Sequence, residues 1–207
     1  MCWNETVSLN TFLFSLFGLL FAYFNNVINS YLFVHLLSFN SMQLLEYFTW
    51  KHLNNKKINR LLSMLGLFLI FIQPILFIIS SYNVEKEIKT VMITLYVVFS
   101  MFCVYNFPID FSMTKARNGH LAWNWLQFPT PIIFIWAAFA FGLLIYRKQY
   151  IRFTMHLMLF LAIYYTYYTT HTWGSLWCWI SNLIAVQLIA QVFFKFEAPN
   201  LLLFKNK

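Results

Sequence analysis

The stretch from Ser30 to His52, SYLFVHLLSFNSMQLLEYFTWKH, is the feature that most constrains how this chain can fold. About 20 apolar residues, each adding about 1.5 Å to a helix, cross the hydrocarbon core of a bilayer. The stretch is long enough and apolar enough to do so, and runs of the same kind recur along the chain. We therefore expect a membrane protein built from transmembrane helices.

This stretch also carries polar groups on one side. His35, Gln43, Glu46 and Trp50 fall within roughly 80° of arc at ~100° per residue, so they form a single stripe on the predicted helix. A carboxylate at the centre of a bilayer costs about 2.5–3.5 kcal/mol, and such a group faces other helices or water instead of lipid. Glu46 is therefore the first candidate for a functional residue.

The overall composition agrees with a membrane protein. The chain has 207 residues, of which 61% are hydrophobic and only 10% are charged, and its mean hydropathy is +0.65. Soluble domains contain about 25% charged residues. The formal net charge of +8 comes from lysines and arginines between the apolar runs, where they fix topology and meet lipid headgroups, so we do not expect nucleic-acid binding.

The apolar runs predict an all-α, polytopic membrane protein with seven transmembrane helices in one domain, residues 1–207. The expected spans are about residues 9–24, 30–50, 61–80, 90–105, 132–146, 153–170 and 174–194. With the N-terminus outside, eight lysines and arginines lie on the cytoplasmic side and six on the other, which does not decide the orientation. The glycosylation acceptor Asn4-Glu5-Thr6 favours an outside, lumenal N-terminus.

Residues 106–131, between spans four and five, are too polar to cross a membrane. Asn118-Gly119 predicts a turn, and the tryptophans that follow are typical of an interfacial segment at the level of the lipid headgroups. The alternative is a lid that folds over the mouth of the bundle. Its residues would be Asp110, Arg117, His120, Trp123 and Trp125.

Spans two and six share a sequence pattern, VHLLSF (34–39) and MHLMLF (155–160). The stripe of span two then corresponds to His156, Tyr164, Tyr167 and His171 in span six. Two parallel three-helix repeats joined by a linker helix would explain this pairing and would place a site at the repeat interface, while chance similarity of aromatic runs is the alternative. The topology resembles that of SWEET-type sugar transporters, although the prolines of that family are absent from spans one, two, five and six. The resemblance implies a pathway lined by Trp50, Trp173 and Asn182.

Four motifs carry a closer resemblance: MCWNETVSLNTF at the start, QLLEYFTW (43–50), NGHLAWNW (118–125) and WGSLWCWISN (173–182). With them the chain resembles an uncharacterised family of multi-span membrane proteins from large, AT-rich DNA viruses. The resemblance covers nearly the whole chain. It implies a host or virion membrane as the location, and it implies no activity.

Two kinds of membrane chemistry fit poorly. A retinal protein needs a Schiff-base lysine within its last span, and residues 183–194 contain none. A zinc-dependent lipid hydrolase needs three protein ligands, and the histidines His35, His52, His120, His156 and His171 show no pair at ligand spacing. The hydrolase remains an alternative only if His35, His156 and Glu46 converge through tertiary packing. We expect no metal site, no cofactor and no catalytic residues.

The pattern favours a conduit, carrier or sensor for a proton, a cation or a small polar solute. Buried ionisable and amide groups within spans mark such paths, so Glu46 would accept the proton or cation. Gln43, Gln73 and Asn182 would line the path. The alternative is a structural or partner-binding membrane protein, because polar stripes also hold bundles together. The expected partners are the lipid bilayer, a small ion or solute, and a second copy of the chain, which small residues in span five would admit.

Overall fold

The computed structural model describes residues 4–178 and 180–194. Most of this part is helical, and the all-α prediction is confirmed apart from one small hairpin. The elements in chain order are α1 (Glu5–Phe24), α2 (Ser30–Lys51), α3 (Lys56–Ser80), α4 (Lys86–Asn106), β1 (Met113–Lys115), β2 (Leu121–Trp123), η1 (Asn124–Leu126), α5 (Thr130–Tyr146), α6 (Tyr150–Tyr167), η2 (Tyr168–Thr170), α7 (Trp173–Cys178) and α8 (Ile180–Phe194).

Asparagine side chains start the first three helices. The side-chain carbonyl of Asn4 accepts a hydrogen bond from the N–H of Val7, and Asn29 and Asn55 make the same bond three residues ahead. Each bond satisfies one of the N–H groups that the first turn of a helix leaves without a partner. The short polar connections of this sequence therefore also define where α1, α2 and α3 begin.

Four helical segments are long and apolar enough to cross a membrane: α1, α3, α4 and the stretch Trp173–Phe194 that contains α7 and α8. The helix α5 is apolar but shorter, with 17 residues. The outer face of α4 is apolar and exposed. Val98, Met101 and Tyr105 are 60%, 67% and 90% exposed, and side chains of this kind are stable against acyl chains.

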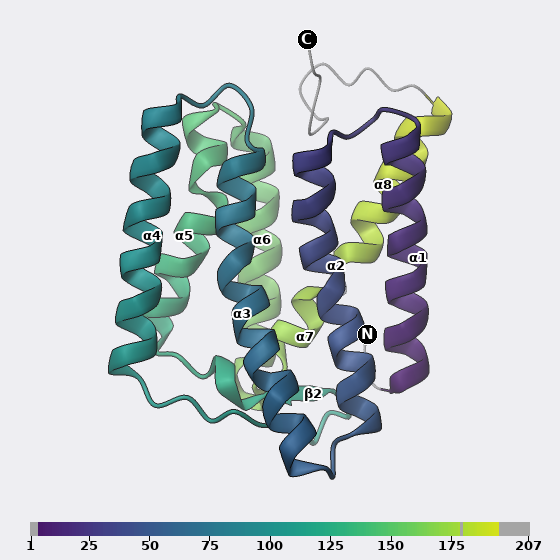
Figure 1. Cartoon of the computed structure of the whole chain (residues 1–207), viewed down its shortest axis with the longest axis vertical. Helices are drawn as coiled ribbons and strands as arrows, with labels where there is room; N and C mark the ends of the chain where they lie inside the picture. Colours follow the sequence, from purple (N-terminus) through teal and green to yellow (C-terminus); the bar gives the residue numbers. More distant parts are fainter. Residues whose placement is uncertain (1–3, 179, 195–207) are drawn as a thin grey trace.

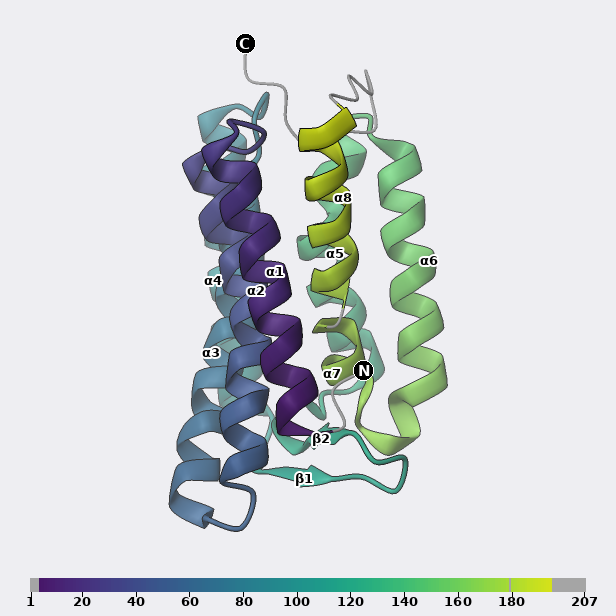
Figure 2. The same cartoon turned by 90° about the vertical axis from the view of Figure 1, so that its right-hand side faces the viewer.

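The helices form an antiparallel bundle in which α2 is central (Figure 1). It packs between α1 and α3 and also contacts α7 and α8. The first helix and the last are in contact, while α6 packs on α5 and α7. Figure 2 shows the hairpin β1–β2 lying across one end of the bundle, near the start of α1. We call this the hairpin end, and the end with the α1–α2, α3–α4 and α5–α6 connections the opposite end.

Two hydrophobic clusters fill the bundle. The smaller one joins α1, α2 and α8 through Leu19, Ala22, Leu32, Leu36 and Leu188. The larger one joins α2, α3, α4, α5 and α6 to the hairpin segment, and it includes Trp123 and Trp125, each only 1% exposed. These tryptophan side chains are therefore packed inside the bundle and do not face lipid headgroups, because the bundle itself provides their apolar surroundings.

The small residues of span five, Ala138 and Gly142, make no close helix contact with the rest of residues 4–178 and 180–194. A Cβ atom added at Gly142 would meet nothing within 4 Å, and Ala138 is exposed. The close approach occurs instead at Gly18 of α1, where an added Cβ would lie 2.8 Å from Cβ of Ala185 in α8. Glycine at this position is what lets the first and last helices touch.

Candidate functional site

The most deeply buried polar surface belongs to α2. Asn40, Gln43, Glu46 and Thr49 are all 0% exposed. Helices pack on several sides of α2, and these four side chains lie on the sides that other helices cover. A carboxyl within a bundle of apolar helices is expected to face other helices or water, and Glu46 faces other helices.

The contacts of two neighbouring residues show where along the bundle Glu46 lies. The amide of Asn40 donates to the carbonyl oxygen of Phe12 in α1 at 3.1 Å. The hydroxyl of Thr49 lies 3.7 Å from Sδ of Met113 in the hairpin. Glu46 stands between these two residues on α2, so it lies in the half of the bundle nearer the hairpin end.

His35 and Gln73 lie elsewhere, in the contact between α2 and α3. The ring of His35 packs 5.5 Å from that of Phe77, and the amide of Gln73 donates to the carbonyl oxygen of Ser38 at 3.5 Å. Eleven residues of helix separate His35 from Glu46, which is about 16 Å. The structure therefore does not bring these predicted pathway residues together with Glu46. At the other end of the stripe, Trp50 is half-buried beside the α2–α3 connection.

The predicted residues of α6 lie at its two ends. His156 packs on Phe141 of α5 with ring centroids 5.8 Å apart, and its Nδ1 lies 2.8 Å from the carbonyl oxygen of Arg152. Tyr167 lies near the other end, with its ring 6.4 Å from that of His120. His171 follows in a left-handed conformation with φ of +56°, and its carbonyl oxygen accepts a hydrogen bond from the N–H of Trp123.

The repeat hypothesis pairs His35 with His156, and the two rings have non-equivalent neighbours. His35 faces α3, the third helix of the first repeat, whereas His156 faces α5, the first helix of the second. The packing of α2 between α1 and α3 does have a parallel in the packing of α6 on α5 and α7. The way the helices pack is thus similar in the two proposed repeats, whereas the neighbours of His35 and His156 are different.

Asn182 joins the first and last helices. Its side-chain carbonyl accepts from the hydroxyl of Ser15 at 3.0 Å, and its amide lies 3.4 Å from the hydroxyl of Thr11. Ser15 is also within 3.2 Å of the Ser181 hydroxyl. These bonds between α1 and α8 are the kind that hold transmembrane helices together. The predicted pathway residues are therefore distributed over separate helix contacts, and Gln43 and Glu46 are the adjacent pair among them.

The segment with β1, β2 and η1, residues 113–126, closes the hairpin end, and we call it the plug. β1 and β2 pair antiparallel with Met113 opposite Trp123, and the predicted turn includes Gly119, whose φ of +83° suits glycine. Asn59 of α3 holds the plug by two hydrogen bonds to Met113. Its side-chain amide donates to the carbonyl oxygen of Met113, and its side-chain carbonyl accepts from the N–H of Met113, both at 2.8 Å.

Two stacked tryptophans of the plug pack inside the bundle. The rings of Trp123 and Trp125 lie 4.9 Å apart and nearly parallel, at 15°. Glycines on two helices make room for them. A Cβ added at Gly66 of α3 would lie 2.7 Å from Trp125, and one added at Gly174 of α7 would lie 2.5 Å from Trp123. Neither glycine, nor Asn59, stands out in the sequence, because only tertiary packing gives them a role.

Of the residues expected in a lid, His120, Trp123 and Trp125 are buried, whereas Asp110 and Arg117 are exposed. Burial lowers the pKa of the His120 imidazole below its usual value. The part of the plug that enters the bundle is therefore neutral and aromatic, and the charged residues of the segment stay in contact with water.

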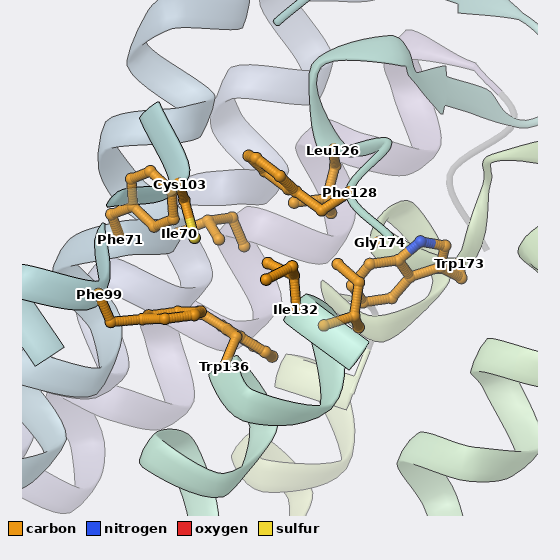
Figure 3. A pocket seen from close by; sticks show the side chains of 11 residues that line it. Ile70, Phe71, Phe99, Cys103, Leu126, Phe128, Ile132, Trp136, Trp173 and Gly174 are labelled. Carbon is orange, nitrogen blue, oxygen red and sulfur yellow. The ribbon is translucent and has the colours of Figure 1, made fainter. Parts of the chain in front are cut away.

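An apolar pocket lies behind the plug, where α3, α4, α5 and α7 meet (Figure 3). Only hydrophobic side chains and Gly174 line it: Ile70, Phe71, Phe99, Cys103, Leu126, Phe128, Ile132, Ile133, Trp136, Trp173 and Gly174. The Cys103 thiol is the single ionisable group in this lining, so the pocket does not bring together a set of groups for acid–base or metal chemistry. Within residues 4–178 and 180–194, no three His, Cys, Asp or Glu side chains gather as a metal site would require, so His35, His156 and Glu46 do not converge.

Comparisons with known proteins add nothing to this picture, since no family model, curated protein or solved structure matches the chain.

Proposed function

We propose that the protein is a seven-helix membrane conduit, carrier or sensor for a proton, a cation or a small polar solute, with Glu46 as the group that accepts it. The observation that carries the proposal is the complete burial of the Glu46 side chain, at 0% exposure, one turn from the equally buried Gln43. A carboxyl is expensive to keep in such surroundings, and a role in binding or relaying a cation explains why it is there.

The chemistry at Glu46 would be simple. A neutral carboxylic acid is easier to bury than a carboxylate, so the group favours uptake of a proton or pairing with a cation. The amide of Gln43 supplies neutral polar lining, which binds a passing solute without holding it by charge. The carrier would load by protonation or cation binding at Glu46 and would discharge when water or a pathway reaches this group.

Access from the hairpin end is closed in this conformation, because the plug packs over the half of the bundle in which Glu46 lies. A conduit with its mouth at this end would open by moving the plug away from Asn59, Gly66 and Gly174. A proposed host or virion membrane and an outside N-terminus would place the plug on the lumenal or outer side. Three of the lysines that enter the charge comparison, Lys195, Lys205 and Lys207, lie outside the described residues.

The test is ion flux in proteoliposomes under an imposed pH or potassium gradient. We expect flux in the wild type and its loss in Glu46→Gln, which keeps the shape of the side chain and removes its charge. Glu5→Gln is the matched control, because Glu5 is an exposed carboxylate at the start of α1. Absence of flux in the folded wild type, or equal flux in Glu46→Gln, would refute the proposal.

A second candidate is a structural or partner-binding membrane protein without transport. The hydrogen bonds of Asn40, Gln73 and Asn182 favour it, because each of them joins one helix to another. In that case Glu46→Gln would leave every measured flux unchanged and affect only the thermal stability of the bundle.

A further inference from the structure

Two arginines at the opposite end of the bundle are buried far more than their charge would suggest. Arg152 in the first turn of α6 is only 5% exposed, and Arg147, which follows α5, is half-buried. Arg147 belongs to the short connection between α5 and α6, and Arg152 lies in the helical turn that follows it. Lysine and arginine side chains are almost never buried like this unless a partner compensates their charge.

The protein supplies only part of that compensation. One N–H of the Arg152 guanidinium donates to the side-chain carbonyl of Gln149 at 3.2 Å. The guanidinium of Arg147 stacks on the Tyr82 ring at 3.9 Å. Nε and Nη2 of Arg152 and Nη2 of Arg147 are buried without any hydrogen-bond acceptor among the described residues. Three N–H-bearing nitrogens of the two guanidinium groups are thus buried without the acceptors that such donors normally have.

The surroundings of the two arginines are positive. Arg147 and Arg152 act on each other by repulsion, and Arg147 also repels the ammonium group of Lys89 in α4. Tyr82 is the other group acting electrostatically on the two arginines, and within residues 4–178 and 180–194 no carboxylate does so. An anion bound between these cations would be attracted by each of them and would offset their mutual repulsion.

The backbone of the connection supports the same ligand. Leu144 and Ile145 accept hydrogen bonds from Gln149 and Lys148 at the end of α5, and Lys148 takes a left-handed conformation with φ of +58°. This sharp turn brings Arg147 beside the start of α6. No side chain caps α6, so the N–H groups of its first turn add their partial positive charge to that of the arginines.

We propose that Arg147, Arg152 and the first turn of α6 form a binding site for a phosphate group. Guanidinium forks match phosphate oxygens in geometry and charge, which favours phosphate over a single-point anion such as chloride. The site lies at the end of the bundle, where the headgroups of the surrounding leaflet lie, so a phospholipid headgroup is one source of the phosphate and a soluble phosphate is the other. This site is separate from Glu46 and does not depend on transport.

The test measures binding to the full chain purified in a neutral detergent and a phosphate-free buffer. Phosphatidic acid is the probe, and diacylglycerol is the matched lipid without phosphate. We expect phosphatidic acid to bind and to raise the midpoint of thermal unfolding, and diacylglycerol to do neither. Loss of charge-assisted hydrogen bonds in Arg152→Gln or Arg147→Gln should weaken binding at least about tenfold. Lys148→Gln, which removes an exposed cation two residues from the N-terminus of α6, should bind like the wild type.

Inorganic phosphate separates the two sources. Competition by inorganic phosphate against phosphatidic acid at similar concentration identifies a soluble phosphate site, and failure to compete identifies a headgroup site; either result supports the proposal. Arg152→Lys covers the case in which Arg152→Gln does not fold, because it keeps the charge and loses the fork, and it should still weaken binding several-fold. Two results would overturn the phosphate-site proposal. One is equal binding of phosphatidic acid by the wild type, both arginine variants and Lys148→Gln, and the other is binding of diacylglycerol as strong as that of phosphatidic acid.

Discussion

The close contact between Gly66 and Trp125 gives the sharpest test of how the plug is held. In Gly66→Ala the new methyl group would lie 2.7 Å from Cζ2 and 3.2 Å from Cη2 of Trp125. The indole cannot move aside easily, because Trp125 is buried and stacked on Trp123. Either the ring or α3 must shift, and both belong to the same packed cluster.

The expected effect is the sum of two opposing contributions. Adding a methyl group to a well-packed core costs about 1–3 kcal/mol of unfolding free energy. Replacing glycine by alanine inside a helix returns up to about 1 kcal/mol. Gly142→Ala is the matched control, because Gly142 lies inside α5 and an added Cβ there meets nothing within 4 Å. The difference between the two variants isolates the collision, and we expect Gly66→Ala to be the less stable by about 1–3 kcal/mol.

Thermal unfolding in detergent measures this difference, and near-UV circular dichroism of the tryptophans reports whether the stack is disturbed. A second substitution tests the cause. Trp125→Phe removes the part of the indole that the new methyl group would meet, so Gly66→Ala should cost less in that background than in the wild type. Equal stability of Gly66→Ala and Gly142→Ala would refute this account of the plug.

The other two predictions concern the same segment. Asn59→Leu leaves the N–H and the carbonyl of Met113 without their partner. We expect the free energy of unfolding to fall by about 2–4 kcal/mol and residues 107–129 to become accessible to protease. Unchanged protection of this segment from protease would contradict the prediction. Burial lowers the pKa of His120, so below about pH 6.5 the unfolded state takes up the proton first and stability falls as the pH falls. His120→Gln should therefore show a weaker loss of thermal stability between about pH 7 and pH 5 than the wild type, and coincident pH profiles would exclude the mechanism.

The helices of this protein are largely predictable from sequence, for a simple physical reason. Apolar runs end at asparagines or charged residues, and Asn29 and Asn55 both terminate the connections and cap the helices that follow. The prediction of a helix at residues 30–50 accordingly agrees with α2, Ser30–Lys51. The sequence also shows that α1, α3, α4 and the last helical stretch are long and apolar enough to cross a membrane.

The positions of the candidate residues were less predictable. Helix periodicity places His35 and Glu46 on one side of α2, but it does not reveal that one turn faces α3 while another lies nearer the hairpin end. Tryptophan suits both a lipid interface and a protein core, and Trp123 is in the core because Gly174, far along the chain, leaves space for it. Arg147 and Arg152 look like ordinary loop cations until their burial is known.

The contacts of the plug also fix an order of assembly. Residues 113–126 are synthesised after α2 and α3 and before α7. The partners of Met113 on α2 and α3 are therefore already present when the plug is made. The contact of Trp123 with Gly174 and its backbone hydrogen bond to His171 cannot form until α7 has been made and inserted. Until then the two indole side chains lack part of the surface on which they pack in the folded protein. Closing the hairpin end is therefore a late step in the biogenesis of this protein, and a chain truncated before α7 would display an unfinished aromatic surface to chaperones and proteases.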